Sequence, residues 1–126
     1  MNILIVDDDI GIQNALKAGL VSVGYRVIVA EEANQALRIL KDFVAIKDPI
    51  DLLVTDLRMP GMDGLELIRL ARIISPPLKT LLMTAYGNDE IRKAVDLLGA
   101  CGYLEKPFSP NRALRLIDKY LGTSIG

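Results

Sequence analysis

Short apolar runs alternate strictly with longer amphipathic stretches along this chain of 126 residues. The apolar runs have the length of strands, and the stretches between them have the length of helices. The predicted strands are Asn2 to Val6, Arg26 to Ala30, Asp51 to Thr55, Thr80 to Thr84 and Gly102 to Glu105. Strict alternation of strand and helix requires a parallel sheet with right-handed crossovers and helices on both faces. The sequence therefore predicts an α/β fold built on a doubly wound, five-stranded parallel sheet.

The helices are predicted from apolar residues that recur at intervals of three and four. The expected buried faces carry Ile12, Ala15, Leu16, Leu20 and Val23 in the first helix, Ala33, Ala36, Leu37 and Leu40 in the second, and Ile91, Ala94, Val95 and Leu98 in the fourth. Gly24 ends the first helix. Asp63, followed by Glu66, resembles a capping box at the start of the third helix. Ser109 can cap the fifth helix, with Pro110 in its first turn.

Length and charge limit the classes of function. With 51% hydrophobic residues, the chain suits one domain with a single core, and we assign residues 1–121 to it and residues 122–126 to a tail or linker. Fifteen basic residues against 16 acidic ones give no extended basic surface, so we expect no direct nucleic-acid binding. No apolar run approaches the roughly 20 residues that cross a bilayer. We therefore expect a cytoplasmic protein without a membrane segment.

Cys101 is the single cysteine, which excludes an intramolecular disulfide and a metal site built on thiolates. We expect it to be a small core residue, because free cysteines are usually buried.

Polar residues stand where four of the apolar runs end. These residues are Asp7, Asp8, Asp56, Thr84 and Lys106. The carboxyl ends of parallel strands lie along one edge of the sheet, where open α/β folds place their ligands. The sequence therefore predicts that these side chains converge.

Carboxylates packed at one edge repel one another unless a cation neutralises them. Oxygen ligands indicate a hard cation, and a few carboxylates with room for water and phosphate suit Mg²⁺ better than Ca²⁺. The alternative is that Asp7, Asp8 and Asp9 only cap a helix and face water, and Asp9 is the best candidate for a cap alone. Beside a bound metal, Asp56 becomes a carboxylate that can attack phosphorus. Lys106 and Thr84 then supply a cation and a hydroxyl for phosphoryl oxygens.

Four segments together resemble the receiver domain of two-component response regulators. They are LIVDDD at Leu4 to Asp9, LLVTDLRMPGMDG at Leu53 to Gly64, MTAYG at Met83 to Gly87 and YLEKPF at Tyr103 to Phe108. The third segment and the helix after it are similar to receivers of enhancer-binding activators and of sporulation-type relays. The resemblance implies the flavodoxin-like (βα)5 fold with strand order 2-1-3-4-5, for which a chemotaxis receiver is a known example.

The resemblance also implies a role for each site residue. Asp7 and Asp8 would form an acidic pocket for Mg²⁺, completed by Asp56 and the backbone carbonyl of Arg58. Asp56 would be the phosphoacceptor. Thr84 would be the switch hydroxyl and Lys106 the phosphate-binding lysine. Ala85 would leave room for the phosphoryl group, Tyr103 would be the aromatic residue that turns inward on activation, and the peptide bond before Pro107 would be cis.

The chain contains no histidine, so a phosphohistidine donor must be another protein or another part of a larger one. The resemblance implies a sensor histidine kinase or a histidine phosphotransfer protein. The expected activity is self-modification, with acetyl phosphate as an alternative donor, and not turnover of a free substrate. Phosphorylation would change the surface of the fourth helix, fifth strand and fifth helix, which would bind a partner, an output domain or a second copy in a homodimer.

Arg58 and Tyr86 occupy positions that differ between receivers and that we expect to set the lifetime of the phosphorylated form. Our hypothesis is that the bulk of Tyr86 restricts the attacking water and slows hydrolysis.

Three other functions fit parts of the pattern. A flavodoxin-like FMN binder needs a phosphate-cradling loop after the first strand, where this chain has three aspartates. A phosphatase of the haloacid-dehalogenase type needs a second carboxylate two residues after its nucleophile, and Arg58 occupies that position. A phosphorylation-independent interaction module would not need the complete set of five polar residues.

Overall fold

The computed structural model describes residues 1–85 and 87–122. Its elements are β1 (Asn2–Val6), α1 (Ile10–Ser22), β2 (Arg26–Ala30), α2 (Ala33–Ala45), β3 (Leu52–Asp56), α3 (Gly64–Ile74), β4 (Lys79–Thr84), α4 (Asp89–Leu97), β5 (Gly102–Glu105) and α5 (Pro110–Leu121). The strands form one sheet in the order β2-β1-β3-β4-β5, and every neighbouring pair is parallel. The fold class and the strand order predicted from the sequence are confirmed.

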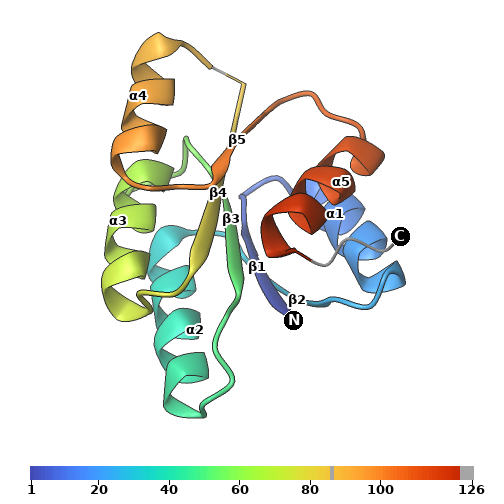
Figure 1. Cartoon of the computed structure of the whole chain (residues 1–126), viewed down its shortest axis with the longest axis vertical. Helices are drawn as coiled ribbons and strands as arrows, with labels where there is room; N and C mark the ends of the chain where they lie inside the picture. Colours follow the sequence, from blue (N-terminus) through green and yellow to red (C-terminus); the bar gives the residue numbers. More distant parts are fainter. Residues whose placement is uncertain (86, 123–126) are drawn as a thin grey trace.

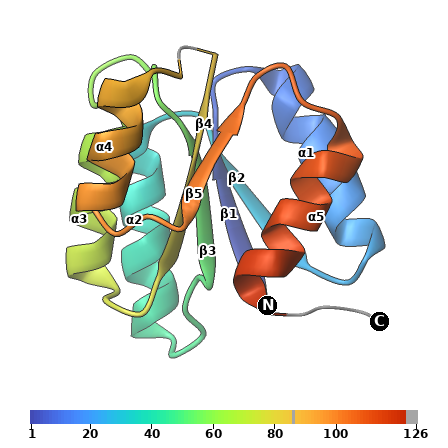
Figure 2. The same ribbon diagram turned by 45° about the horizontal axis from the view of Figure 1, so that its top comes forward.

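Helices cover both faces of the sheet (Figures 1 and 2). Helices α1 and α5 lie on one face, and α2, α3 and α4 lie on the other. Alternate residues of each strand therefore enter different cores: Leu4 and Leu53 pack toward α2 and α3, whereas Ile5 and Val54 pack toward α1 and α5. Because both faces are covered, the central strands are apolar without interruption.

Three boundaries, in two of the strands, differ from the prediction by one residue each. The third strand includes Asp56, which pairs with Met83, and it begins after Asp51. Asp51 lies just before the strand, and its carboxylate accepts a hydrogen bond of 2.7 Å from the backbone N–H of Asn2. The fourth strand begins at Lys79, whose N–H donates to the carbonyl of Asp51.

The predicted helix caps are largely confirmed. Asp63 accepts a hydrogen bond from the N–H of Glu66, and Ser109 accepts one from the N–H of Arg112. In a full capping box, the Glu66 carboxylate would also accept a hydrogen bond from the backbone N–H of Asp63. Here it binds the guanidinium of Arg69 instead. The third helix is thus capped by Asp63 alone.

The buried face of α1 differs from the prediction at three positions. Ala15 and Val23 are exposed, and the polar Gln13 is buried in their place beside Leu16 and Leu20. Val23 lies at the carboxyl cap, where the chain already turns away toward the edge strand β2.

Cys101 is only half-buried, contrary to our expectation of a core position. It precedes β5, which is an edge strand of the sheet. Among the described residues, no helix is long and apolar enough to cross a membrane.

Candidate functional site

The polar residues predicted to converge lie at the carboxyl ends of β1, β3, β4 and β5. One carboxylate oxygen from each of Asp7, Asp8 and Asp56 lies within 4.8 Å of the other two. Asp7 is fully buried, the side chain of Asp56 is 13% exposed, and Asp8 is exposed. The cluster therefore has a closed inner side and an open outer side.

Lys106 places its ammonium between two of these carboxylates. Its Nζ lies 2.8 Å from Oδ2 of Asp7 and 3.3 Å from Oδ2 of Asp56. The backbone N–H of Lys106 also donates to the carbonyl of Thr84 at 2.8 Å, which connects the ends of β4 and β5. The site thus brings together three carboxylates and one ammonium, and the ammonium contacts two of the carboxylates.

The pKa values of two groups reflect this arrangement. Burial raises the pKa of the Asp56 carboxyl above its ordinary value, and the charge of Asp7 raises it further, whereas Lys106 acts against both. Burial by itself would lower the pKa of the Lys106 ammonium. The hydrogen bond and charge of Asp7, together with Asp56, outweigh burial, so the pKa of Lys106 is raised.

The loop after β1 is held in place by its own polar groups. The N–H of Asp9 donates to Oδ1 of Asp7 at 2.9 Å, and the Asp9 carboxylate caps α1 by accepting from the N–H groups of Gly11 and Ile12. Both oxygens of Asp7 are therefore engaged, one by Asp9 and one by Lys106. The expectation that Asp9 serves as a helix cap is confirmed.

Gln13 is a site residue that the sequence analysis missed. Its side-chain amide donates to the backbone carbonyl of Asp7 from a buried position in α1. A signal was present, because Gln13, Leu16 and Leu20 follow the three-and-four spacing of the buried face.

Gly64 was missed for a different reason. A Cβ at this position would lie 2.2 Å from the backbone carbonyl oxygen of Asp56, so α3 begins in direct contact with the end of β3. The N–H of Gly64 donates to the carbonyl of Leu57 at 2.8 Å. Only a residue without a side chain permits this approach.

Thr84 and Ala85 complete the edge of the site. Thr84 is buried at the end of β4 and pairs in register with Glu105, while Ala85 is exposed. The peptide bond between Lys106 and Pro107 is cis.

Two further predicted residues, Tyr103 and Arg58, lie outside the carboxylate cluster. Tyr103 is half-buried and contacts Arg92 of α4. Arg58 is exposed, two residues after Asp56. Tyr86 lies outside the described residues.

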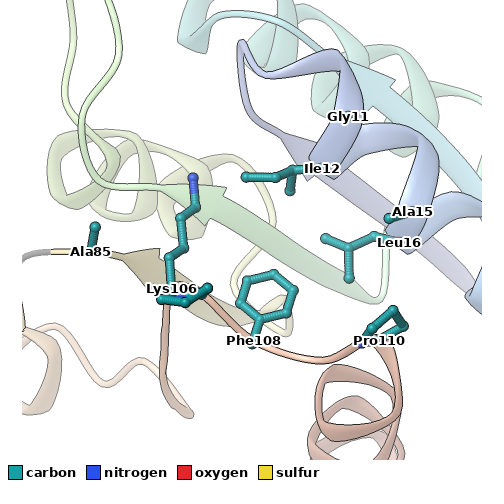
Figure 3. A pocket seen from close by; sticks show the side chains of 9 residues that line it. Gly11, Ile12, Ala15, Leu16, Ala85, Lys106, Phe108 and Pro110 are labelled. Carbon is teal, nitrogen blue, oxygen red and sulfur yellow. The ribbon is translucent and has the colours of Figure 1, made fainter.

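An apolar hollow of about 400 Å³ adjoins the site between α1 and the loop before α5. Figure 3 shows Ile12 and Leu16 of α1 facing Phe108, with the stem of Lys106 beside that ring and its nitrogen pointing away from the apolar side chains. None of the three clustered aspartates lines the hollow, so it is a separate surface that borders the charged site.

The donor set fits a magnesium ion. All three clustered ligands are carboxylate oxygens, which hard cations prefer, and the exposed side of the cluster leaves coordination positions for water and phosphate oxygens. Mg²⁺ usually retains several waters and is bound by one or two carboxylates plus a phosphate, as this geometry allows.

A family model for the response regulator receiver domain matches residues 3–118. The sporulation initiation phosphotransferase F of Bacillus subtilis is 34% identical over 119 residues, which are 94% of this chain and 92% of that protein. The transcriptional regulatory protein GlrR of Escherichia coli (32% identical) and the DNA-binding transcriptional regulator NtrC of Klebsiella pneumoniae (36% identical) are similar too, over 98% and 91% of this chain, but the chain spans only 27% and 24% of their lengths.

Solved structures agree with this match. The receiver domain protein from Methanospirillum hungatei JF-1 superposes with a TM-score of 0.87 at 31% identity, over 97% of this chain and 94% of that one. The beryllofluoride-activated NtrC4 receiver domain dimer gives a TM-score of 0.86 at 29% identity, over 97% of both chains. Receiver domains are signalling switches that bind Mg²⁺ at an acidic pocket, and this chain has a cluster of three aspartates. The chain belongs to the response regulator receiver domain family.

Proposed function

We propose that this chain is a phosphorylation-activated switch that accepts a phosphoryl group on Asp56 from a phosphohistidine. The observation that carries the proposal is the position of the Asp56 carboxylate, within 4.8 Å of the buried carboxylate of Asp7 and 3.3 Å from the ammonium of Lys106. A carboxylate nucleophile, a cation site and a lysine are the groups that phosphoryl transfer to an aspartate requires.

In the proposed reaction, an oxygen of Asp56 forms a bond to phosphorus while the phosphorus–nitrogen bond of the donor breaks. The electron pair of that bond returns to the imidazole nitrogen. Asp7, Asp8, Asp56 and the backbone carbonyl of Arg58 would hold Mg²⁺, which neutralises charge on the phosphoryl oxygens. Lys106 binds a phosphoryl oxygen in place of its present contact with Asp56, and Thr84 donates its hydroxyl to another.

The donor is a phosphohistidine of a sensor kinase or of a histidine phosphotransfer protein. Because residues 1–126 contain no histidine, it lies in another protein or in another part of a larger one. The apolar hollow beside Lys106 offers contact surface for this donor at the same edge of the sheet. Water ends the signal by displacing phosphate from Asp56. We predict that Tyr86 slows this hydrolysis. The assignment of residues 1–121 to the receiver domain and of residues 122–126 to a tail or linker is also a prediction.

The output of the switch is a change in the surface of α4, β5 and α5. A phosphoryl group adds nearly two negative charges and three acceptor oxygens, enough to draw Thr84 toward it and to open space for Tyr103. The changed surface controls a partner, a second copy of the chain or an output domain. The exposed residues Arg92, Lys93, Arg112 and Arg115 lie on these helices.

Intact-mass spectrometry after incubation with acetyl phosphate and Mg²⁺ tests the proposal. We expect a gain of one phosphoryl group in the unaltered protein, and no gain in Asp56→Asn or in the presence of EDTA. A phosphoryl gain that survives Asp56→Asn would show that another residue is the acceptor.

A further inference from the structure

Arg92, in the first turns of α4, contacts the Tyr103 side chain in two ways. Its Nε donates a hydrogen bond to the Tyr103 hydroxyl, and its guanidinium carbon lies 5.4 Å from the centre of the Tyr103 ring. An arginine within about 6 Å of a ring centre is attracted by the electrons of the ring face. One side chain thus engages both the hydroxyl and the ring of Tyr103.

Glu105 adds a third, weaker contact to the same arginine. Its Oε1 lies 4.0 Å from Nη2 of Arg92, with both side chains more than half exposed, so this ion pair contributes little. A Cβ at Gly87 would lie only 2.7 Å from Oε1 of Glu105. The Glu105 carboxylate is therefore packed against the segment that follows Thr84. Arg92, Tyr103 and Glu105 therefore meet beside the segment that joins β4 to α4.

Helix α4 has little apolar packing to fix its position. Val95 is the only fully buried residue of its nine, whereas α3 buries four of its 11. At its carboxyl end, α4 is held by a hydrogen bond from the Arg72 guanidinium of α3 to the carbonyl of Leu98. Ile91 in its amino-terminal half packs against the core but is only partly buried, so the polar contacts of Arg92 add to the few contacts that hold this half in place.

We propose that Arg92 is a positioning residue that holds Tyr103 in its resting orientation and so opposes activation of the switch. This inference rests on the proposed function. Turning Tyr103 toward Thr84 must break both the hydrogen bond and the contact between the guanidinium and the ring. The free energy of these two contacts therefore adds to the cost of the conformational change that a phosphoryl group on Asp56 must drive.

The orientation of Tyr103 can be measured without phosphorylation. Protein labelled with 3-fluorotyrosine gives ¹⁹F resonances from its four tyrosines, and the Tyr103 resonance is the one lost in Tyr103→Phe. Beryllofluoride with Mg²⁺ marks the activated position of that resonance. In untreated protein, Arg92→Ala should move it toward the activated position and raise the activated fraction about two- to fivefold, the range that an exposed cation–π contact supports.

Lys93→Ala is the matched control, since it removes the same charge from the next residue of the same helix. It should leave the Tyr103 resonance where it is in the unaltered protein. Arg92→Ala should also raise the rate of phosphorylation by acetyl phosphate, because less of the binding of the phosphoryl group is spent on releasing Tyr103. This increase should be smaller in a Tyr103→Phe background, where the hydrogen bond to Arg92 is already absent.

An unchanged Tyr103 resonance in Arg92→Ala, or a shift equal to that of Lys93→Ala, would overturn the inference. A shift away from the activated position would overturn it as well. If beryllofluoride leaves Tyr103 unmoved in the unaltered protein, the proposed switch fails, and with it the claim that Arg92 opposes activation. The restraint of Tyr103 by Arg92 would still be decided by the resonance in untreated Arg92→Ala.

Discussion

Lys106 forms an ion pair of 2.8 Å with Asp7, whose side chain is completely buried. A buried carboxylate without a cation is strongly unfavourable, so this lysine stabilises the site before any metal or phosphate binds. Lys106→Met should lower the free energy of unfolding by about 3 kcal/mol in EDTA, as measured by urea denaturation. Mg²⁺ should restore part of the loss.

The matched control for that prediction is Lys93→Met, which changes an exposed lysine on α4 and should alter stability by less than about 0.5 kcal/mol. Equal stability of Lys106→Met and the unaltered protein in EDTA would contradict the role of the ion pair.

Asp56→Asn should stabilise the metal-free protein at neutral pH. The folded-state pKa of Asp56 is raised above its ordinary value of 3.8, so the folded protein binds this proton more tightly than the unfolded chain does. That stabilisation is complete below the unfolded pKa and is lost as the pH rises through the folded pKa. We expect a gain on the order of 1 kcal/mol at pH 7 that shrinks toward pH 3, measured by denaturation at several pH values. If Asp56→Asn is less stable than the unaltered protein at pH 7, the ionised Asp56 carboxylate does not destabilise the metal-free fold.

The raised pKa of Asp56 also predicts how its carboxyl titrates in the metal-free protein. Because burial and the charge of Asp7 disfavour the ionised form, this carboxyl should take up its proton at a higher pH than an ordinary aspartate does. Carbon NMR of labelled protein in EDTA, with Asp56→Asn to identify the resonance, measures this. A titration that begins only near the ordinary value of 3.8 would contradict the burial that we assign to this group.

Mg²⁺ affinity should depend on Asp8 and not on its neighbour Asp9. Asp8→Asn should weaken Mg²⁺ binding by about tenfold or more in titration calorimetry, a loss that even an outer partner of a metal ligand can cause. Asp9→Asn is the control, because asparagine also caps helices and Asp9 is occupied with the amino terminus of α1. Similar losses in the two variants would mean that the general negative charge of the loop, and not a defined site, binds the ion.

Much of this fold could be predicted because each strand and helix follows from a local pattern. The apolar centres of β1 and β3 and the caps Asp63 and Ser109 are examples. The convergence of Asp7, Asp56 and Lys106 could be predicted from the rule that parallel strands share one edge. Gly64 could not, since the need for glycine arises only where α3 approaches the carbonyl of Asp56.

Tertiary contacts explain the other differences. Gln13 is buried although polar because the Asp7 carbonyl accepts its hydrogen bond, and Arg92 meets Tyr103 only because α4 lies beside β5. No periodicity in the sequence reports either partner. The position of Cys101 likewise depends on the order of the strands, which places β5 at an edge.

Thr84→Val should separate phosphorylation from the response to it. The buried hydroxyl of Thr84 is not needed for attack by Asp56, so the variant should still gain a phosphoryl group, while the Tyr103 ¹⁹F resonance should no longer move. Thr80→Val is the control on the same strand. The Thr80 hydroxyl is buried and, within the described part of the chain, has no hydrogen-bond partner, so this variant should respond normally and be about 1 kcal/mol more stable. A normal Tyr103 response in Thr84→Val would remove Thr84 from the switch.

The central claim is that Asp56 itself carries the phosphoryl group, and reductive trapping tests it most directly. Borohydride converts a phosphorylated aspartate into homoserine, which peptide mass spectrometry locates in the sequence. After treatment with acetyl phosphate and Mg²⁺, we predict homoserine at position 56 and none at positions 7, 8 or 9. Homoserine at one of those positions, or none anywhere in protein shown to be phosphorylated, would contradict the account.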